Sequence, residues 1–314
     1  MKMLQLSAHG AIVITNCSAR KRQFGPSVSY PEGAHSTLDE MARSWISATK
    51  ASEQASEARH LYVGRAFSDA RITAQAIQGA LFIASAGFGL IAAEQQLPHY
   101  CLTVSGGAGS IRHNLRAIGA SSSDWWQAIK KVLGQPSLAH LVMRPEVDSV
   151  LLSMPSSYLA MVRQDLADLP HRYVDKLRVF TSSAGMNEVP EQLRSAVLPY
   201  DDRLERVAAY AGTRADFPQR AMRHFVEALG AHRMSLAKGV FAVEQALAGM
   251  ERPNVPARAK AADAEIAALL RAQWTKHGGS SSRLLRFLRD DAMVACEQGR
   301  FRGIWWSVKS EMAA

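Results

Sequence analysis

The chain alternates between short, mainly apolar runs and longer segments in which apolar residues recur at helical spacing. Four apolar runs have the length and composition of strands that are buried on both faces. They cover residues 11–15, 80–84, 150–154 and 177–181. The helical segments between them include residues 38–56, 124–133 and 156–169. Buried strands that alternate with amphipathic helices predict an α/β fold, with a mainly parallel sheet flanked by helices.

The pattern changes after residue 199, because helical periodicity continues there without another buried apolar run. Helical segments follow at residues 204–211, 218–229 and 236–250. Residues 252–257 contain two prolines and an asparagine, a composition typical of a linker. We therefore expect three parts: an α/β domain at residues 1–198, a helical region with a linker at residues 199–258, and a small helical unit at residues 259–314.

The small unit at residues 259–314 predicts two helices joined by a glycine turn. Residues 264–274 are helical by pattern, and His277-Gly278-Gly279 breaks that pattern before a second helix begins at Ser281. This arrangement is typical of a helix-turn-helix, and residues 301–306 are a candidate strand for its wing. Arginines lie between the leucines of the second helix: Arg283, Arg286 and Arg289. The alternative is a helical cap whose arginines face solvent.

The net charge of +9 indicates the class of partner, because the basic residues are spread through the chain rather than gathered in one tail. Such a field favours polyanions, with nucleic acid first and acidic membrane surfaces second. Arginine dominates the basic residues and binds phosphate with its fork, so we expect DNA, duplex or single-stranded, as the partner. The candidate contacts are Arg20, Arg22, Arg220, Arg223 and the three arginines of the small unit. The alternative is a basic protein that does not bind nucleic acid.

Several classes of protein are excluded by features that the sequence lacks. No apolar run approaches the ~20 residues that span a bilayer, and the N-terminus lacks the apolar stretch of a signal peptide. The cysteines, Cys17, Cys101 and Cys296, are odd in number and far apart, which argues against a disulfide scaffold and suits a reducing cytoplasm. No CxxC or HxxxH spacing indicates a metal site. We expect a cytoplasmic protein that needs no metal, cofactor or membrane.

Small and polar residues follow the first two buried strands, at the edge of the sheet where α/β folds bind ligands. The first loop, residues 16–22, is polar and ends on an Arg-Lys-Arg run suited to phosphate. The second loop, residues 85–90, carries two glycines that permit tight turns and the close approach of a ligand. The alternative for the second loop is a strand-to-helix turn without a ligand.

Four motifs follow one another between residues 11 and 105. They are a strand followed by NCSxRKR, then LYxGRxF, then a strand ending in SAxxGL, and finally PxYxLT. The residues that carry them are Cys17, Ser18, Lys21, Tyr62, Gly64, Arg65, Phe67, Ser85, Ala86, Gly89, Leu90, Pro98, Tyr100, Leu102 and Thr103. Their order resembles the superfamily of the YaaA-like peroxide-stress proteins and the core domain of archaeosine synthase. The resemblance implies an α/β domain that binds DNA or acts on a modified nucleobase, with the cysteine and lysine of the first loop among the motif residues.

The loops at the expected sheet edge supply candidate residues for a nucleobase pocket. Enzymes that act on a base flip it out of the stack and hold it between aromatic and apolar groups. Tyr62, Phe67 and Phe88 are suited to such stacking, with packing in the core as the alternative. The candidate pocket residues are Asn16, Cys17, Ser18, Tyr62, Gly64, Arg65, Phe67, Ser85, Gly87, Phe88 and Gly89.

These expectations favour a DNA-binding enzyme of the DNA glycosylase type, which excises a modified or damaged base in DNA repair or defence. Cleavage of the N-glycosidic bond builds positive charge on the sugar, and Asp69, Asp201 and Asp202 are the candidate carboxylates to stabilise it. Lys21 is the alternative catalytic group, as an amine whose pKa is lowered by burial or by its cationic neighbours, or else a phosphate contact. Two other functions stay open: a non-catalytic DNA-binding stress or regulatory protein, and a tRNA base-modifying transferase.

Overall fold

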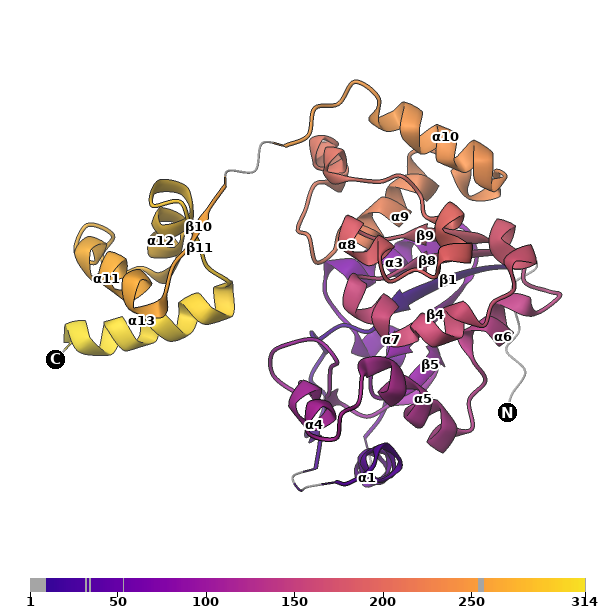
Figure 1. Ribbon diagram of the computed structural model, residues 1–314, viewed down its shortest axis with the longest axis horizontal. Helices are drawn as coiled ribbons and strands as arrows, with labels where there is room; N and C mark the ends of the chain where they lie inside the picture. The colour runs from indigo at the N-terminus through magenta and orange to yellow at the C-terminus, as the bar shows by residue number, and fades with distance from the viewer. Residues whose placement is uncertain (1–9, 32, 34, 53, 254–256, 314) are drawn as a thin grey trace. The chain divides into compact units, whose positions relative to one another are not determined.

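The computed structural model describes residues 10–31, 33, 35–52, 54–253 and 257–313 of the chain. These residues form two compact units, of which the first ends at Arg252 and the second begins at Pro253 (Figure 1). The first unit contains a five-stranded, mostly parallel sheet with helices on both faces, which confirms the predicted mixed α/β fold. The helical region expected at residues 199–258 belongs to this first unit as far as residue 252.

The main sheet has the strand order β5-β4-β1-β8-β9. Its strands are β1 (Ala11–Asn16), β4 (Ala80–Ser85), β5 (Gly89–Ala92), β8 (Ser149–Ser153) and β9 (Leu177–Phe180). Four of them run parallel, and β5 is antiparallel to its neighbour β4. Ile12, Val13 and Ile14 of the central strand β1 are fully buried, because helices cover both faces of the sheet.

Two groups of helices cover the sheet. In the first group, α3 (Arg65–Ala76) and α9 (Phe217–Glu227) pack on each other and on the strands. The second group consists of α1 (Leu38–Lys50), α5 (Ser122–Leu133) and α7 (Ser156–Ala167). The crossover from β1 to β4 and the crossover from β8 to β9 run in opposite directions along the sheet. Right-handed crossovers therefore place α3 and α7 on opposite faces.

Shorter elements complete the first unit. Outside the main sheet, β2 (Val28–Ser29) pairs with β7 (Tyr100–Cys101), and β3 (Ser56–Glu57) pairs with β6 (Gln96–Leu97). The remaining helices are α2 (Ala58–Leu61), α4 (Arg112–Ala117), α6 (Leu138–Met143), α8 (Ser183–Met186) and α10 (Leu236–Leu247). The helix expected at residues 204–211 is instead two 3-10 turns, Asp202–Arg206 and Ala208–Tyr210. Arg220 binds Glu205 and the Tyr210 carbonyl, which holds this segment in turns around its guanidinium.

The glycine loop at residues 85–90 is a hairpin turn, and the alternative of a strand-to-helix turn is wrong. In the antiparallel pairing of β4 with β5, Phe82 lies opposite Ala92 and Ser85 opposite Gly89. Gly89 adopts a φ of +69°, the left-handed conformation that favours glycine in a tight reversal. Residues 89–92 alternate between buried and half-buried positions, which is the period of a strand and not of a helix.

The second unit is a small helical body with its own apolar core. Its elements are β10 (Ala259–Lys260), α11 (Asp263–Gln273), α12 (Ser281–Arg286), a π-helical turn (Phe287–Asp291), β11 (Val294–Ala295) and α13 (Gln298–Ala313). The expected wing strand at residues 301–306 is wrong, because these residues lie within α13. Phe301, Ile304 and Val308 are buried and recur at helical spacing, so their packing overrides the β-propensity of the Ile-Trp-Trp sequence.

Candidate functional site

The candidate site lies where β1 and β8 end. From β1 the chain continues to β4 on one side of the sheet, and from β8 it continues to β9 on the other (Figure 1). Open α/β sheets bind ligands outside the carboxyl ends of their strands at such a change of direction. Asn16 ends β1 and Ser153 ends β8, and the polar loop expected from the sequence follows Asn16 directly.

Lys21 lies in an extended segment that pairs with the loop before α3. It forms an antiparallel β-bridge with Tyr62, and the amide of Arg22 donates to the Leu61 carbonyl (2.8 Å). Successive side chains of an extended segment point to opposite sides. Lys21 is accordingly half-buried, whereas Arg20 and Arg22 are exposed. The Arg-Lys-Arg run therefore does not present three cations to one partner.

The Lys21 amine lies against aromatic rings. Its Nζ atom is 4.1 Å from the centroid of the Tyr100 ring and 5.7 Å from that of Tyr62. Burial lowers the pKa of Lys21, and the nearby thiols of Cys17 and Cys101 oppose this shift. Among the described residues, the amine makes no hydrogen bond or ion pair with a carboxylate. Burial, one of the two causes expected from the sequence, thus favours the neutral and nucleophilic form of the amine, whereas the face of the Tyr100 ring favours its charged form.

Three buried hydroxyl groups join the hairpin to the loop before α3. The Tyr100 hydroxyl lies 2.7 Å from the Tyr62 hydroxyl and 2.8 Å from Ser85 Oγ. Ser85 Oγ accepts hydrogen bonds from the backbone amides of Gly87 (3.3 Å) and Phe88 (3.2 Å). Burial raises the pKa of both phenols, so the two tyrosines stay neutral. The network holds the hairpin against the segment that pairs with Lys21.

The aromatic candidates for base stacking lie in the core, as the packing alternative expected. Their exposed fractions are 2%, 3% and 7% for Tyr62, Phe67 and Phe88 respectively. Gly87 lies close to the rings of Trp45 and Tyr100, because a Cβ atom at this position would be 3.1 Å from each ring. Gly87 therefore makes room for these rings.

The first loop is held by its own polar side chains. Cys17 is 3% exposed, and its Sγ atom lies 3.0 Å from the hydroxyl of Tyr158 in α7. The Ser18 hydroxyl donates to the Val63 carbonyl (2.8 Å). Gly64, next to Val63, has a φ of +108° and begins α3. These bonds position the backbone that carries Lys21 without placing the Cys17 thiol at the surface.

Gln219 of α9, which the sequence did not indicate, covers the ends of β1 and β8. Its Nε2 atom donates to Asn16 Oδ1 (2.9 Å), Thr15 Oγ1 (3.1 Å) and the Ser153 carbonyl (3.1 Å). Gln219 Oε1 and Ser153 Oγ are buried and have no hydrogen-bond partner within the described residues. No local signal could have identified Gln219, because two of its partners lie 203 and 204 positions away in the chain.

The three candidate carboxylates are held in ion pairs. Asp69 of α3 is buried, and its Oδ1 accepts from Arg223 (3.0 Å), while Arg65 Nε lies 3.8 Å from Oδ2. Burial raises the pKa of Asp69, and Arg223 opposes this shift. Asp201 and Asp202 lie at the start of a 3-10 turn and pair with neighbouring arginines. None of the contacts in the described part of the chain joins these carboxylates to the lysine of the first loop.

The seven arginines expected to contact DNA differ in exposure. Arg220 is 1% exposed and forms ion pairs with Asp216 and Glu205. Arg223 forms ion pairs with two carboxylates, and Arg289 donates to a backbone carbonyl (2.8 Å). The exposed members of the set are Arg20, Arg22, Arg283 and Arg286.

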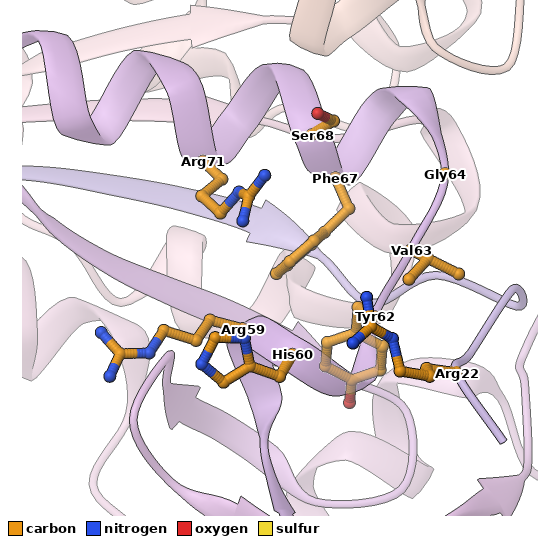
Figure 2. Close-up of a pocket in the computed structure, with 9 residues that line it drawn as sticks. All are labelled: Arg22, Arg59, His60, Tyr62, Val63, Gly64, Phe67, Ser68 and Arg71. Atoms are coloured by element: carbon orange, nitrogen blue, oxygen red, sulfur yellow. The ribbon is translucent and has the colours of Figure 1, made fainter. Parts of the chain in front are cut away.

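A hollow of about 180 Å³, here called the basic pocket, opens beside Tyr62 (Figure 2). It is lined by Arg22, Arg59, His60, Tyr62, Val63, Gly64, Phe67, Ser68 and Arg71. Sequence reasoning missed five of these residues: Arg59, His60, Val63, Ser68 and Arg71. A signal existed for Arg71, because it follows Phe67 by four residues and so shares a face of the predicted helix with it.

Comparison of the chain with protein-family models, with curated proteins and with solved structures finds no significant match. The resemblance of residues 11–105 therefore stays an expectation. In the described part of the chain, no helix has both the length and the apolar character to cross a membrane. Nor do these residues bring together three His, Cys, Asp or Glu side chains in a group that could hold a metal ion.

Proposed function

We propose that this chain binds nucleic acid and acts on a nucleobase within it, cleaving the N-glycosidic bond with the amine of Lys21. One observation carries the proposal: the Lys21 amine is half-buried beside Tyr100, with a pKa lowered by burial. A neutral amine is the form that attacks carbon. The exposed Arg20 and Arg22 flank Lys21 and suit the phosphates of a nucleic-acid chain.

In the proposed reaction, the neutral amine attacks the sugar carbon that carries the base, once the nucleotide is turned out of the stack. A carbon–nitrogen bond forms to Lys21, and the bond between sugar and base breaks with its electron pair leaving on the base. The amine gives one proton to the departing base and one to the ring oxygen as the sugar ring opens. The product is a Schiff base between Lys21 and the sugar.

The test is borohydride trapping with duplex DNA, single-stranded DNA and tRNA, the DNA carrying alkylated, oxidised or deaminated bases. Borohydride reduces a Schiff base to a stable amine, so the parent protein should form a covalent adduct. Lys21→Arg should form none, because its side chain has no nucleophilic amine. Lys131→Arg is the control, since Lys131 is 70% exposed and pairs with Asp39, and it should keep the adduct.

Other outcomes of the same experiment identify the alternatives. Retardation of DNA without an adduct or a product would overturn the catalytic proposal in favour of a non-catalytic DNA-binding stress or regulatory protein. Exchange of a labelled base into tRNA would overturn it in favour of a base-modifying transferase. A trapped adduct that persists in Lys21→Arg would assign the chemistry to another amine.

We also propose that α11 and α12 of the second unit act as a DNA-binding helix-turn-helix. Arg283 and Arg286 support this assignment, because both are exposed on α12 and neither forms an ion pair within the described residues. Arg289 donates to the Cys296 carbonyl and is assigned to the fold instead. Replacing Arg283 and Arg286 with alanine should weaken duplex binding, measured by fluorescence anisotropy, and an unchanged affinity would eliminate this role.

A further inference from the structure

We propose that the basic pocket binds a phosphate group of the nucleic-acid backbone, adjacent to the nucleotide on which Lys21 acts. The identity of that nucleotide rests on the proposed function, whereas the pocket is argued from its own charge, lining and size. Its arginines come from three segments: Arg22 after β1, Arg59 in α2 and Arg71 in α3, and His60 of α2 adds an imidazole to the lining. Figure 2 shows Arg71 and Phe67 projecting from α3 into the hollow, with Arg59 and His60 on its other side.

The positive charge of the pocket is only partly compensated. Arg59 is held by two carboxylates, with Nε 2.6 Å from Glu57 Oε2 and Nη1 3.9 Å from Glu94 Oε1. Arg22 and Arg71 are exposed and form no ion pair with any residue that the structure describes. Two arginine forks are thus available, and their field favours an anion.

The lining suits a phosphate that carries a sugar. An arginine fork donates to two phosphate oxygens at once, and the Ser68 hydroxyl adds a further donor at the same hollow. The rings of Tyr62 and Phe67, whose centroids are 5.4 Å apart, close the floor of the hollow on the side of the core, where both are almost fully buried. The hollow of about 180 Å³ is several times the ~30 Å³ share of one water. It therefore has room for a phosphate and part of its sugar.

The pocket is next to the proposed reactive lysine. Arg22 follows Lys21 directly, and adjacent Cα atoms are about 3.8 Å apart. Tyr62 is shared, because it lines the pocket and also forms the β-bridge with Lys21. A nucleic-acid strand whose phosphate occupies the pocket therefore passes the segment that carries Lys21, and the nucleotide must turn past Tyr62 to reach the Lys21 amine, because the Lys21 side chain lies on the side of the segment opposite to Arg22.

The test compares Arg22→Ala/Arg71→Ala with the parent in binding of labelled duplex DNA as a function of salt. Loss of two phosphate contacts should reduce the slope of log affinity against log salt by about 1.8. Between 50 and 200 mM salt, the affinity of the parent should then fall about 12-fold more than that of the variant. Arg43→Ala/Arg163→Ala is the control, because both arginines are exposed and already paired with carboxylates, and it should keep the parent slope. Urea unfolding of each variant establishes that the fold is intact.

Competition identifies the anion. Inorganic pyrophosphate should displace DNA from the parent more readily than from Arg22→Ala/Arg71→Ala, whereas displacement by polyglutamate alone would overturn the phosphate assignment. An unchanged slope in the double variant overturns the pocket even when Lys21 is trapped on DNA. A reduced slope without any trapping supports the pocket and overturns only the catalytic proposal, so the two failures are distinguishable.

Discussion

Lys21, which is half-buried, and Arg220, which is buried, are two cations of the same unit with opposite surroundings. The guanidinium of Arg220 lies 2.7 Å from a carboxylate oxygen of Asp216 and 2.7 Å from one of Glu205. The Lys21 amine has aromatic rings and two thiols around it, and no carboxylate partner among the described residues. A buried charge with its counter-charges built into the fold stabilises that fold, whereas one without them costs free energy. The missing counter-charge, rather than burial itself, therefore marks the candidate for chemistry.

The largest effect on stability is expected when Arg220, the cation with carboxylate partners, is removed. Arg220→Ala leaves Asp216 and Glu205 without their partner, so the free energy of unfolding should fall by about 3–5 kcal/mol, as measured by urea denaturation. Arg163→Ala removes an exposed pair with Glu188 and should change the stability much less. Equal losses in the two variants would contradict the structural role of Arg220.

A smaller loss of stability is expected for a substitution at Gly87, which packs against the aromatic rings near Lys21. A Cβ atom on Gly87 would lie 3.1 Å from the rings of Trp45 and Tyr100, so Gly87→Ala should lower the free energy of unfolding by about 1–3 kcal/mol. Gly106→Ala is the control, because its Cβ would meet nothing within 4 Å. Full stability of Gly87→Ala together with loss of the borohydride adduct would instead assign the hairpin to a ligand.

The smallest effect on stability is expected when Lys21, the cation without a carboxylate partner in the described part of the chain, is replaced. Lys21→Met should unfold at the same or a higher urea concentration than the parent at neutral pH. In the folded protein, the pKa of Lys21 lies below its ordinary value of 10.5. At pH values between the folded pKa and 10.5, the unfolded chain therefore binds more protons than the folded protein. The parent therefore gains stability as pH rises through this window, and the advantage of Lys21→Met should shrink toward pH 10.5. A difference in stability that is independent of pH would show that burial does not perturb this amine.

The sheet was accessible from the sequence because its signal is local. The four parallel strands are mainly apolar, with Arg178 in β9 and serines at both ends of β8 as the interruptions, and such runs report burial on both faces without reference to partners. The predictions of secondary structure that were wrong concern segments whose conformation is set by contacts with distant residues. Residues 301–306 have β-propensity, but Phe301 and Ile304 pack on the core of the second unit as part of a helix. Residues 204–211 have helical spacing, but hydrogen bonds from Arg220 to Glu205 and to the Tyr210 carbonyl stabilise turns there instead.

The candidate site was accessible in part. The loop of Lys21 follows from strand ends and motif order, which are local properties of the sequence. Whether a given arginine is buried or exposed cannot be predicted in this way. A composition rich in arginine does not distinguish Arg220, which is enclosed by carboxylates, from the exposed Arg22. Gln219 and the carboxylate pair of Arg223 depend on α9 folding over α3, and that contact is invisible before the tertiary structure.

The position of β1 at the centre of the sheet has a consequence for the synthesis of the chain. Val13 pairs with Leu81 on one side and with Leu151 on the other, so its second partner is made 138 residues later. At about 5–20 residues per second, a ribosome needs roughly 7–28 s to cover that distance. Throughout this interval the apolar residues of β1 have at least one unpaired edge, which is a template for pairing with other chains. Strand order alone therefore leaves that edge open to other chains until β8 has been made.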